Sequence, residues 1–290
     1  MTRDDAVVVE QYQGFGLRID RRGRALVTFE RPERLNAMSF ATRRDLVEVL
    51  SSFQLDDRVR VVIITGTGKG FCAGAYLGQA EEEPMLARGR TVKTQKTPVN
   101  LNGRLRTYSQ ELVRTVRRLD KITIAAVNGY AIQIGLSLAL ACDFVIAAES
   151  AKLGSATLRM GYQPDEGGHW LLVEHLGVKG AIDFAMRKRI VGAEEALRLG
   201  LASEIVADDS LTARAYELAA ELTDGPQVAM RLLKRAIYNA AHLTFDEAGE
   251  DITTRTAISD FHADAIEGWP AWARHETPVF NHWLTEDTQP

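Results

Sequence analysis

Short apolar runs alternate with longer amphipathic stretches over most of the chain. GLRID (16–20) and ALVTF (25–29) flank the polar turn 21–24 and predict a β-hairpin. Three further runs are rich in β-branched residues and are typical of strands buried on both faces of a sheet: RVVIIT (60–65), ITIAAV (122–127) and FVIAA (144–148).

Helical spacing of apolar residues predicts helices between these strands. The first has Ser39 as a plausible N-cap and carries Leu46, Val47, Val49 and Leu50 on one side. The predicted helices cover about 39–54, 102–119, 134–142 and 167–176. Strands that alternate with helices predict an α/β fold with a mainly parallel sheet.

The pattern changes after Ala207, where three successive helical segments follow without an intervening strand. They are LTARAYELAAELTDG (211–225), PQVAMRLLKRAIYNA (226–240) and FDEAGEDITTRTAISDFHADAIEG (245–268). The chain is therefore predicted to consist of an α/β core, residues 1–206, and a helical C-terminal region, residues 207–290.

Composition narrows the functional class. The chain has 290 residues, 46% of them hydrophobic and 26% charged, which is ordinary for a globular protein. A formal net charge of −4 provides no basic field for nucleic acid. Cys72 and Cys142 form no CxxC pair and no disulfide framework, and no apolar run is long enough to cross a membrane. With an N-terminus too acidic for a signal peptide, these features predict a cytoplasmic protein.

Two glycine-containing turns are candidates for ligand contact. TGTGKGFCAGA (65–75) lacks the hydroxyl residue after Lys69 that a P-loop needs, and it does not match the dinucleotide pattern GxGxxG. Its small residues at 72–75 would allow the backbone to approach a ligand closely. In VNGYAIQIGLSLA (127–139) a strand, a turn and an apolar helix follow one another, and exposed N–H groups at such a helix start can hold negative charge. Either segment alone is explained by packing, but together they predict a two-donor oxyanion hole.

Several segments resemble the crotonase family, the enoyl-CoA hydratase/isomerase superfamily, over about residues 14–280. The segments are RPERLNAMS (31–39), GTGKGFCAGAYL (66–77), IAAVNGYAIQIGLSLALACDFVIAAESAKLG (124–154), GAEEALRLGLASEIV (192–206) and EGWPAWARHETPVF (267–280). The resemblance implies a spiral of ββα units and a helical region that assembles trimers, often paired into hexamers. It implies an acyl-CoA thioester substrate, with coenzyme A as part of the substrate; no separate cofactor, metal, nucleic-acid or membrane partner is expected.

Site residues follow from the resemblance position by position. The two oxyanion donors would be the backbone N–H groups of Ala75 and Ile134; the family's usual Gly at the second position is Ile here, with Gly135 next to it. The family's usual Asp after the first donor is Tyr76, which would reshape the near wall. The residues expected to bind the substrate or its CoA part are Arg34, Leu35, Ala73, Tyr76, Leu77, Gly135 and His169.

The chain departs from the family at the two glutamates that its hydratases use. Those positions are Ser137 and Thr157, and neither can act as a base near neutral pH. The resemblance therefore disfavours a standard two-glutamate hydration.

A pair of acids in GYQPDEGGHW (161–170) offers a replacement. Isomerases of the superfamily keep a carboxylate close to the position of Asp165, and its β-diketone hydrolases keep one at the position of Glu166, followed by a His at the position of His169. Burial in a thioester pocket would raise the pKa of such a carboxyl toward working pH. Reach favours Glu166 for proton transfer, and one of the two acids is expected to cap the following helix. The Gly167-Gly168 pair would let one acid enter the pocket while the other faces away.

Three functions follow from these residues. The first is an enoyl-CoA hydratase/isomerase-like enzyme that stabilises a thioester enolate, as an isomerase or an atypical hydratase. The second is a hydrolase of the same fold that cleaves a C–C bond in a 1,3-diketone. The third is a non-catalytic acyl-CoA-binding protein, which would not exchange protons at the α-carbon of its ligand.

Overall fold

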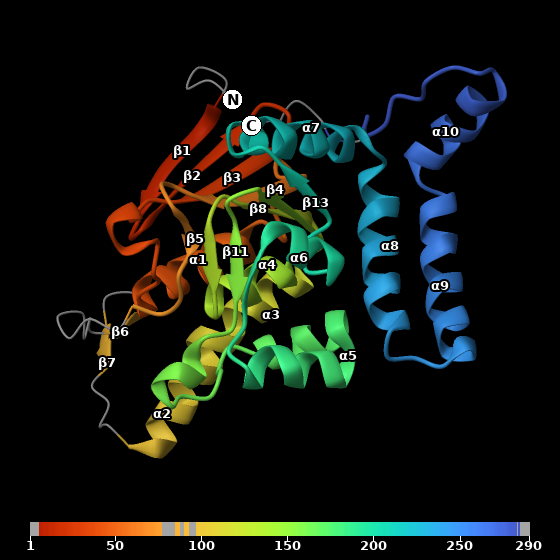
Figure 1. Cartoon of the computed structure of the whole chain (residues 1–290). Coiled ribbons are helices and arrows are strands. Elements are labelled where there is room, and N and C mark those ends of the chain that lie inside the picture. The colour runs from red at the N-terminus through yellow and green to blue at the C-terminus, as the bar shows by residue number, and fades with distance from the viewer. Residues whose placement is uncertain (1–5, 77–84, 88–89, 93–96, 283, 285–290) are drawn as a thin grey trace.

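A seven-stranded sheet forms the centre of the computed structural model, which describes the chain except residues 1–5, 77–84, 88–89, 93–96, 283 and 285–290 (Figure 1). Its strand order is β1-β2-β3-β4-β8-β10-β13. The strands are β1 (Ala6–Tyr12), β2 (Phe15–Asp20), β3 (Arg24–Phe29), β4 (Val61–Gly66), β8 (Ile122–Val127), β10 (Phe144–Ala148) and β13 (Glu204–Val206).

The predicted hairpin and buried strands are confirmed. β2 and β3 pair antiparallel, and every pair from β3 to β13 is parallel. β1, which pairs antiparallel with β2, was not predicted. In β4 the alternate residues Val61 and Ile63 join one apolar core while Val62 and Ile64 join another, on the opposite face. Both faces of the strand are buried, and this is why its sequence is a continuous apolar run rather than an alternating one.

A second sheet of four short strands carries the turns of interest. Its order is β12-β11-β9-β5, from β12 (Ile190–Gly192), β11 (Lys152–Gly154), β9 (Tyr130–Ile132) and β5 (Gly70–Cys72). β5 and β9 run parallel, with Cys72 beside Ala131. A separate hairpin joins β6 (Met85–Ala87) and β7 (Arg90–Val92).

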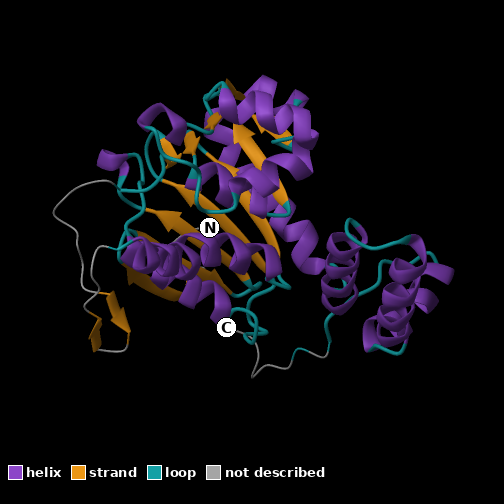
Figure 2. Cartoon of the chain, turned by 90° about the horizontal axis from the view of Figure 1, so that it is seen from below, coloured by secondary structure: helices purple, strands orange, loops and turns teal. Residues whose placement is uncertain are grey.

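Helices cover these sheets (Figures 1 and 2). They are α1 (Phe40–Ser52), α2 (Pro98–Arg104), α3 (Glu111–Arg118), α4 (Ile134–Ala141), α5 (Gly168–Met186) and α6 (Ala193–Arg198), with short helical turns η2 (Pro32–Arg34), η3 (Leu105–Gln110), η4 (Thr157–Met160) and η5 (Asp208–Ser210). Ser39 caps α1 as predicted, by accepting the Thr42 N–H. The segment predicted as one helix over 102–119 is divided by the π-helical turn η3. α5 extends ten residues past its predicted end because the chain resumes helical geometry after a kink at Gly177, whose φ is 65°.

The C-terminal segment contains four helices rather than the three predicted. They are α7 (Leu211–Asp224), α8 (Gln227–Ala240), α9 (Phe245–Asp260) and α10 (Ala263–Ala273). The last two are separate because His262 leaves the helical conformation and caps α10. α7 packs on the large sheet through Leu211, Ala215 and Ala219, whereas α8, α9 and α10 stand beside the α/β body (Figure 1).

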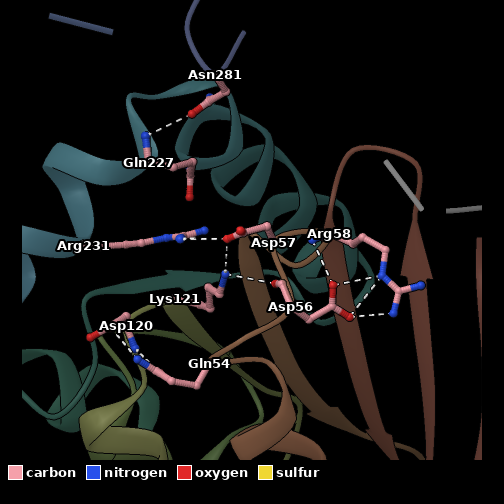
Figure 3. A network of polar contacts seen from close by, with 9 residues as sticks. All are labelled: Gln54, Asp56, Asp57, Arg58, Asp120, Lys121, Gln227, Arg231 and Asn281. Atoms are coloured by element: carbon pink, nitrogen blue, oxygen red, sulfur yellow. Dashed lines mark hydrogen bonds and ion pairs between the residues drawn. The ribbon is translucent and has the colours of Figure 1, made fainter. Parts of the chain in front are cut away.

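A buried polar network holds α8 to the sheet (Figure 3). Lys121, fully buried just before β8, donates to the Asp56 carbonyl at 3.0 Å and lies 3.6 Å from the Asp57 carboxylate. Arg231 of α8 donates to the same carboxylate at 3.2 Å. Burial, and then the neighbouring Arg231 charge, lowers the pKa of Lys121 to about 8.

Candidate active site

The two predicted donor turns lie side by side because they follow neighbouring strands. β5 and β9 are parallel, so the segments that follow the two strands leave the small sheet at the same edge. The CAGA turn continues from Cys72, and the second turn passes through Gln133 into α4. Contact between them is close: a Cβ on Gly135 would lie 2.0 Å from the Cys72 carbonyl oxygen. Glycine at 135 is thus required for this packing, although the preceding residue is Ile134.

Both predicted donor N–H groups lack an acceptor within the part of the chain that the structure describes. Ala75 lies opposite Met38 in a parallel β-bridge, but the residues on either side of Ala75 make the hydrogen bonds. The Met38 N–H donates to the Gly74 carbonyl, and the Tyr76 N–H donates to the Met38 carbonyl. The Ile134 N–H is the first of α4, where no intrahelical acceptor exists. Two unpaired N–H groups on adjacent turns are available to hydrogen-bond an acceptor atom from outside the chain.

Four of the residues predicted to bind the substrate lie together beside these turns. The Ala73 N–H donates to the Leu35 carbonyl at 2.9 Å, which joins the RPERL segment to the CAGA turn. The Arg34 guanidinium lies over the Tyr76 ring at 4.3 Å from its centroid. This is a cation–π contact, which joins Tyr76 to the RPERL segment. Leu77 lies outside the described residues.

Glu166 is the buried member of the acid pair, with 1% of its surface exposed. Its Oε1 accepts from Gln133 Nε2 at 2.6 Å and from the Ser137 hydroxyl at 2.9 Å, and its Oε2 accepts from the Asp165 N–H at 3.1 Å. The carboxyl group therefore lies against Ser137, one of the two positions that lack the family's glutamate. The acid reaches this position from the loop before α5 rather than from α4.

Asp165 is half-buried and therefore more exposed than Glu166. Its side chain hydrogen-bonds to that of Glu166, and its carbonyl accepts from Gln110 Nε2 at 3.3 Å. Burial, and then this hydrogen bond with Asp165, raises the pKa of Glu166. Two carboxyl groups in contact share protons and titrate together. The sequence favoured Glu166 for proton transfer by the reach of its side chain. In the structure that side chain is directed inward and buried, and Asp165 is the more exposed of the two acids.

Glycine is favoured at positions 167 and 168 for two different reasons. Gly167 has φ +89°, which side chains disfavour. A Cβ on Gly168 would lie 2.3 Å from Ser137 Oγ and 3.0 Å from Glu166 Oε1. The expectation that one of the acids caps α5 is wrong: the N-cap is Gly167, and no side chain caps that helix end. The loop instead turns Glu166 inward.

Gln133 links Glu166 to the segment 155–157. Its Oε1 accepts from the backbone N–H groups of Ala156 and Thr157 at 3.2 and 3.3 Å, and from the hydroxyls of Ser155 and Thr157 at 3.1 and 2.9 Å. Because that atom accepts from N–H groups, Nε2 must be the atom that faces Glu166. The residue has φ +54°, held by donation from its own N–H to the Gly154 carbonyl at 2.9 Å.

Arg43 is a buried positive charge on α1. It is 4% exposed on α1, donates from Nη1 to the Ser109 hydroxyl at 2.8 Å, and lies over the Phe40 ring at 5.0 Å. It interacts electrostatically with Asp165, Cys72 and Glu166. Burial lowers the pKa of Arg43, while Asp165 opposes that shift most among its charged neighbours. Burial also raises the pKa of the Cys72 thiol to about 11, so this neighbour is uncharged near neutral pH.

Comparison with known proteins agrees with this geometry. The family model for enoyl-CoA hydratase/isomerase matches residues 21–282. A 1,2-epoxyphenylacetyl-CoA isomerase from Escherichia coli K12 is 34% identical over 259 residues, covering 89% of this chain and 95% of its own. A carnitinyl-CoA dehydratase from E. coli SMS-3-5 is 34% identical over 270 residues, with 91% and 97% covered. A crystal structure of an enoyl-CoA hydratase from Bacillus anthracis has a TM-score of 0.81 and 29% identity, with 92% and 99% covered.

This chain belongs to the enoyl-CoA hydratase/isomerase family. The predicted crotonase fold is confirmed, as is the prediction of an enoyl-CoA hydratase/isomerase-like enzyme. Across the described ranges, no group of three or more His, Cys, Asp and Glu side chains is placed to hold a metal ion. Nor does any helix in those ranges have the length and apolarity to span a membrane.

The sequence predicted the acid pair as a candidate site, but it did not predict two further residues, Gln133 and Arg43. Gln133 is a polar residue in the apolar run AIQIGLSLALA (131–141), and this interruption was the signal that could have identified it. Arg43 lies three and seven residues before Leu46 and Leu50, on the buried stripe of α1, where an arginine is unusual. His169, in contrast, is exposed on the first turn of α5.

Proposed function

We propose that the protein transfers a proton at an acyl-CoA thioester through an enolate, as an isomerase or an atypical hydratase. The observation that carries this proposal is the Asp165–Glu166 pair, which brings a buried carboxyl group against Ser137 in a chain without the family's usual glutamates. The free N–H groups of Ala75 and Ile134 would stabilise the enolate oxygen. The relatives named an acyl-CoA isomerase and an acyl-CoA dehydratase support both reaction types.

In this mechanism Asp165 is the group that exchanges a proton with the substrate. It is half-exposed, whereas the Glu166 carboxyl is enclosed by Gln133 and Ser137. Burial, and then the hydrogen bond with Asp165, raises the pKa of Glu166 and so disfavours its charged form. Asp165 removes the α-proton and returns it at another carbon. Repeated use of one carboxyl group suits isomerisation, since the proton lost is regained.

The experiment measures uptake of deuterium and product formation by mass spectrometry, with enoyl-, dienoyl- and 3-hydroxyacyl-CoAs in deuterated water. Asp165→Asn should lower turnover by about 10²–10⁴-fold, the usual contribution of a general acid/base. Glu166→Gln should cost less, because it keeps the buried hydrogen bonds. The matched control is Asp209→Asn, which removes the charge of an exposed carboxylate distant in sequence from the acid pair. This variant should retain wild-type turnover.

The outcomes separate the alternatives. A larger loss for Glu166→Gln than for Asp165→Asn would assign proton transfer to Glu166. Activity within a few-fold of wild type in both variants would refute the mechanism. Binding of acyl-CoA without any deuterium uptake by the wild type would indicate a non-catalytic binder, and cleavage of a 1,3-diketone would indicate the C–C hydrolase.

We propose further that the C-terminal helices assemble trimers or hexamers. Their apolar side chains are exposed in the single chain, among them Phe261 (88%) and Trp269 (70%). Other exposed apolar residues of these helices are Leu233, Ile237, Leu243, Phe245, Ile252, Ile258, Ile266 and Trp272. A surface of this extent favours burial against other chains.

A further inference from the structure

Two consecutive residues of the π-helical turn η3 hold two different parts of the candidate site. Ser109 is fully buried and accepts from Arg43 Nη1 of α1 at 2.8 Å. Gln110 donates from Nε2 at 3.3 Å to the carbonyl of Asp165, in the acid loop, residues 161–167. Adjacent side chains of a helix point in different directions, so one turn can reach both segments. Turns of this π-helical kind are rare and occur frequently at functional sites.

The Arg43 contact continues to the first donor turn. Arg43 is buried, and its Nη2 donates to the Met38 carbonyl at 3.4 Å. That carbonyl also accepts the Tyr76 N–H at 2.9 Å, and the Met38 N–H donates to the Gly74 carbonyl at 2.9 Å. Ala75 lies between these two hydrogen bonds. The buried guanidinium therefore joins η3 to the segment that fixes the direction of the Ala75 N–H.

The Gln110 contact is made to the main chain of the acid itself. The Asp165 carbonyl accepts from Gln110, and the Asp165 N–H donates to Glu166 Oε2 at 3.1 Å. Glu166 is held in turn by Gln133 and Ser137. The main chain of Asp165 is thus fixed on both sides, by the buried acid and by η3. The direction of a side chain follows the backbone that carries it, so these two bonds also limit where the Asp165 carboxyl group lies.

We propose that η3 is a positioning element of the active site. Gln110 positions Asp165, and the Ser109–Arg43 pair positions the donor turn that carries Ala75. The inference rests on the proposed function, in which Asp165 transfers the proton and the Ala75 N–H stabilises the enolate oxygen. Proton transfer next to the thioester needs a fixed separation between the base and the carbonyl oxygen, and a misplacement of about 1 Å can cost about 10²-fold in rate. Because consecutive residues of one turn hold both segments, η3 sets that separation.

Amide hydrogen exchange of the ligand-free protein, measured by mass spectrometry, tests the two contacts separately. Gln110→Leu should speed exchange about 3–10-fold in the peptide that covers the acid loop, because one neutral hydrogen bond is lost. It should leave the peptide that covers residues 66–76 at the wild-type rate. Ser109→Ala should have the reverse effect, with faster exchange at 66–76 and an unchanged acid loop. The matched control is Thr107→Ala on the same turn, whose exposed hydroxyl donates within its own helix, and both peptides should keep their wild-type rates.

Steady-state kinetics then test whether Gln110 acts through Asp165. Gln110→Leu should lower kcat about 10-fold and change KM by less than about 2-fold, because the contact positions a reacting group rather than the ligand. In the Asp165→Asn background the same change should cost less than about 2-fold, because a positioning residue has no effect once the group that it positions is gone. Full additivity of the two changes overturns the role of Gln110.

Unchanged exchange of the acid loop in Gln110→Leu overturns the inference, as does an equal effect of Thr107→Ala. If Gln110→Leu does not fold, Gln110→Met provides the second variant without a donor, with the same expectation. The reversed exchange patterns of Gln110→Leu and Ser109→Ala, in a protein that turns over no acyl-CoA, would support the two contacts of η3 while refuting the proposed function.

Discussion

Gly168→Ala is expected to disturb the acid site through a single contact. The new Cβ would lie 2.3 Å from Ser137 Oγ and 3.0 Å from Glu166 Oε1, so at least one of these atoms must move. The backbone at Gly168 does not lie in the left-handed region, so alanine brings no conformational strain there. The perturbation is therefore steric and confined to the acid site.

The expected loss of unfolding free energy is about 2 kcal/mol. Overpacking in a tight interior costs about 1–3 kcal/mol. The easiest relief is rotation of the Ser137 hydroxyl, which sacrifices its hydrogen bond to Glu166 at 2.9 Å, worth about 1 kcal/mol.

The assay is urea unfolding of wild type, Gly168→Ala, Ser137→Ala and the double variant at one protein concentration. With Ala at 137 the hydroxyl is absent, and the nearest atom of that residue is Cβ at 3.5 Å, an ordinary contact. The double variant should therefore be less destabilised than the sum of the single changes, by about 1 kcal/mol. Gly167→Ala is the control: it has φ +89° and no neighbour within 4 Å, so its backbone strain should add independently to Ser137→Ala.

Additivity of Gly168→Ala and Ser137→Ala within about 0.5 kcal/mol would refute this reasoning. It would mean that the loop does not press against α4 in solution. The account of Glu166 as a carboxyl held against Ser137 would then fail as well.

Three further predictions concern other parts of the molecule. Gln133→Leu should lower the unfolding free energy by about 2–4 kcal/mol, because it removes the hydrogen-bonding partner of Glu166, Ser155 and Thr157. The control is the exposed Gln163→Leu, whose unfolding free energy should stay within about 0.5 kcal/mol of wild type. Equal effects of the two changes would contradict the role assigned to Gln133. Lys121 has a folded pKa of about 8 against an ordinary value of 10.5, so the unfolded chain binds more protons between these values and stability rises with pH there. Relative to Lys121→Met, wild type should gain about 3 kcal/mol between pH 8 and 10.5 in denaturant titrations; a flat difference would rule out the lowered pKa. Sedimentation velocity at micromolar concentration should show a trimer or hexamer, and a single monomeric species would contradict the proposed assembly.

The sequence by itself determined the elements whose signals are local. Continuous apolar runs predicted strands buried on both faces, and the large sheet buries alternate residues of β4 in two separate cores. Ser39 was recognised as a cap from its position before a helical pattern. The strands and the cap are set by side-chain periodicity and backbone propensity within a few residues, so the chain displays them directly. The resemblance to the family, rather than a local pattern, marked the missing acids at Ser137 and Thr157 and the acids at 165 and 166.

Tertiary structure alone decided how the acids are used. Adjacent residues 165 and 166 have nearly the same local environment in sequence, yet Glu166 is buried and Asp165 is only half-buried. That difference depends on Gly168, where a side chain would clash with Ser137 and Glu166. It also depends on the Gln133 amide, which donates a hydrogen bond to Glu166. Arg43 comes from a helix more than 100 residues earlier than the acids, and it reaches Ser109 only after folding. Burial, desolvation and charge pairing depend on what surrounds a group in three dimensions, and therefore no local pattern could assign the proton.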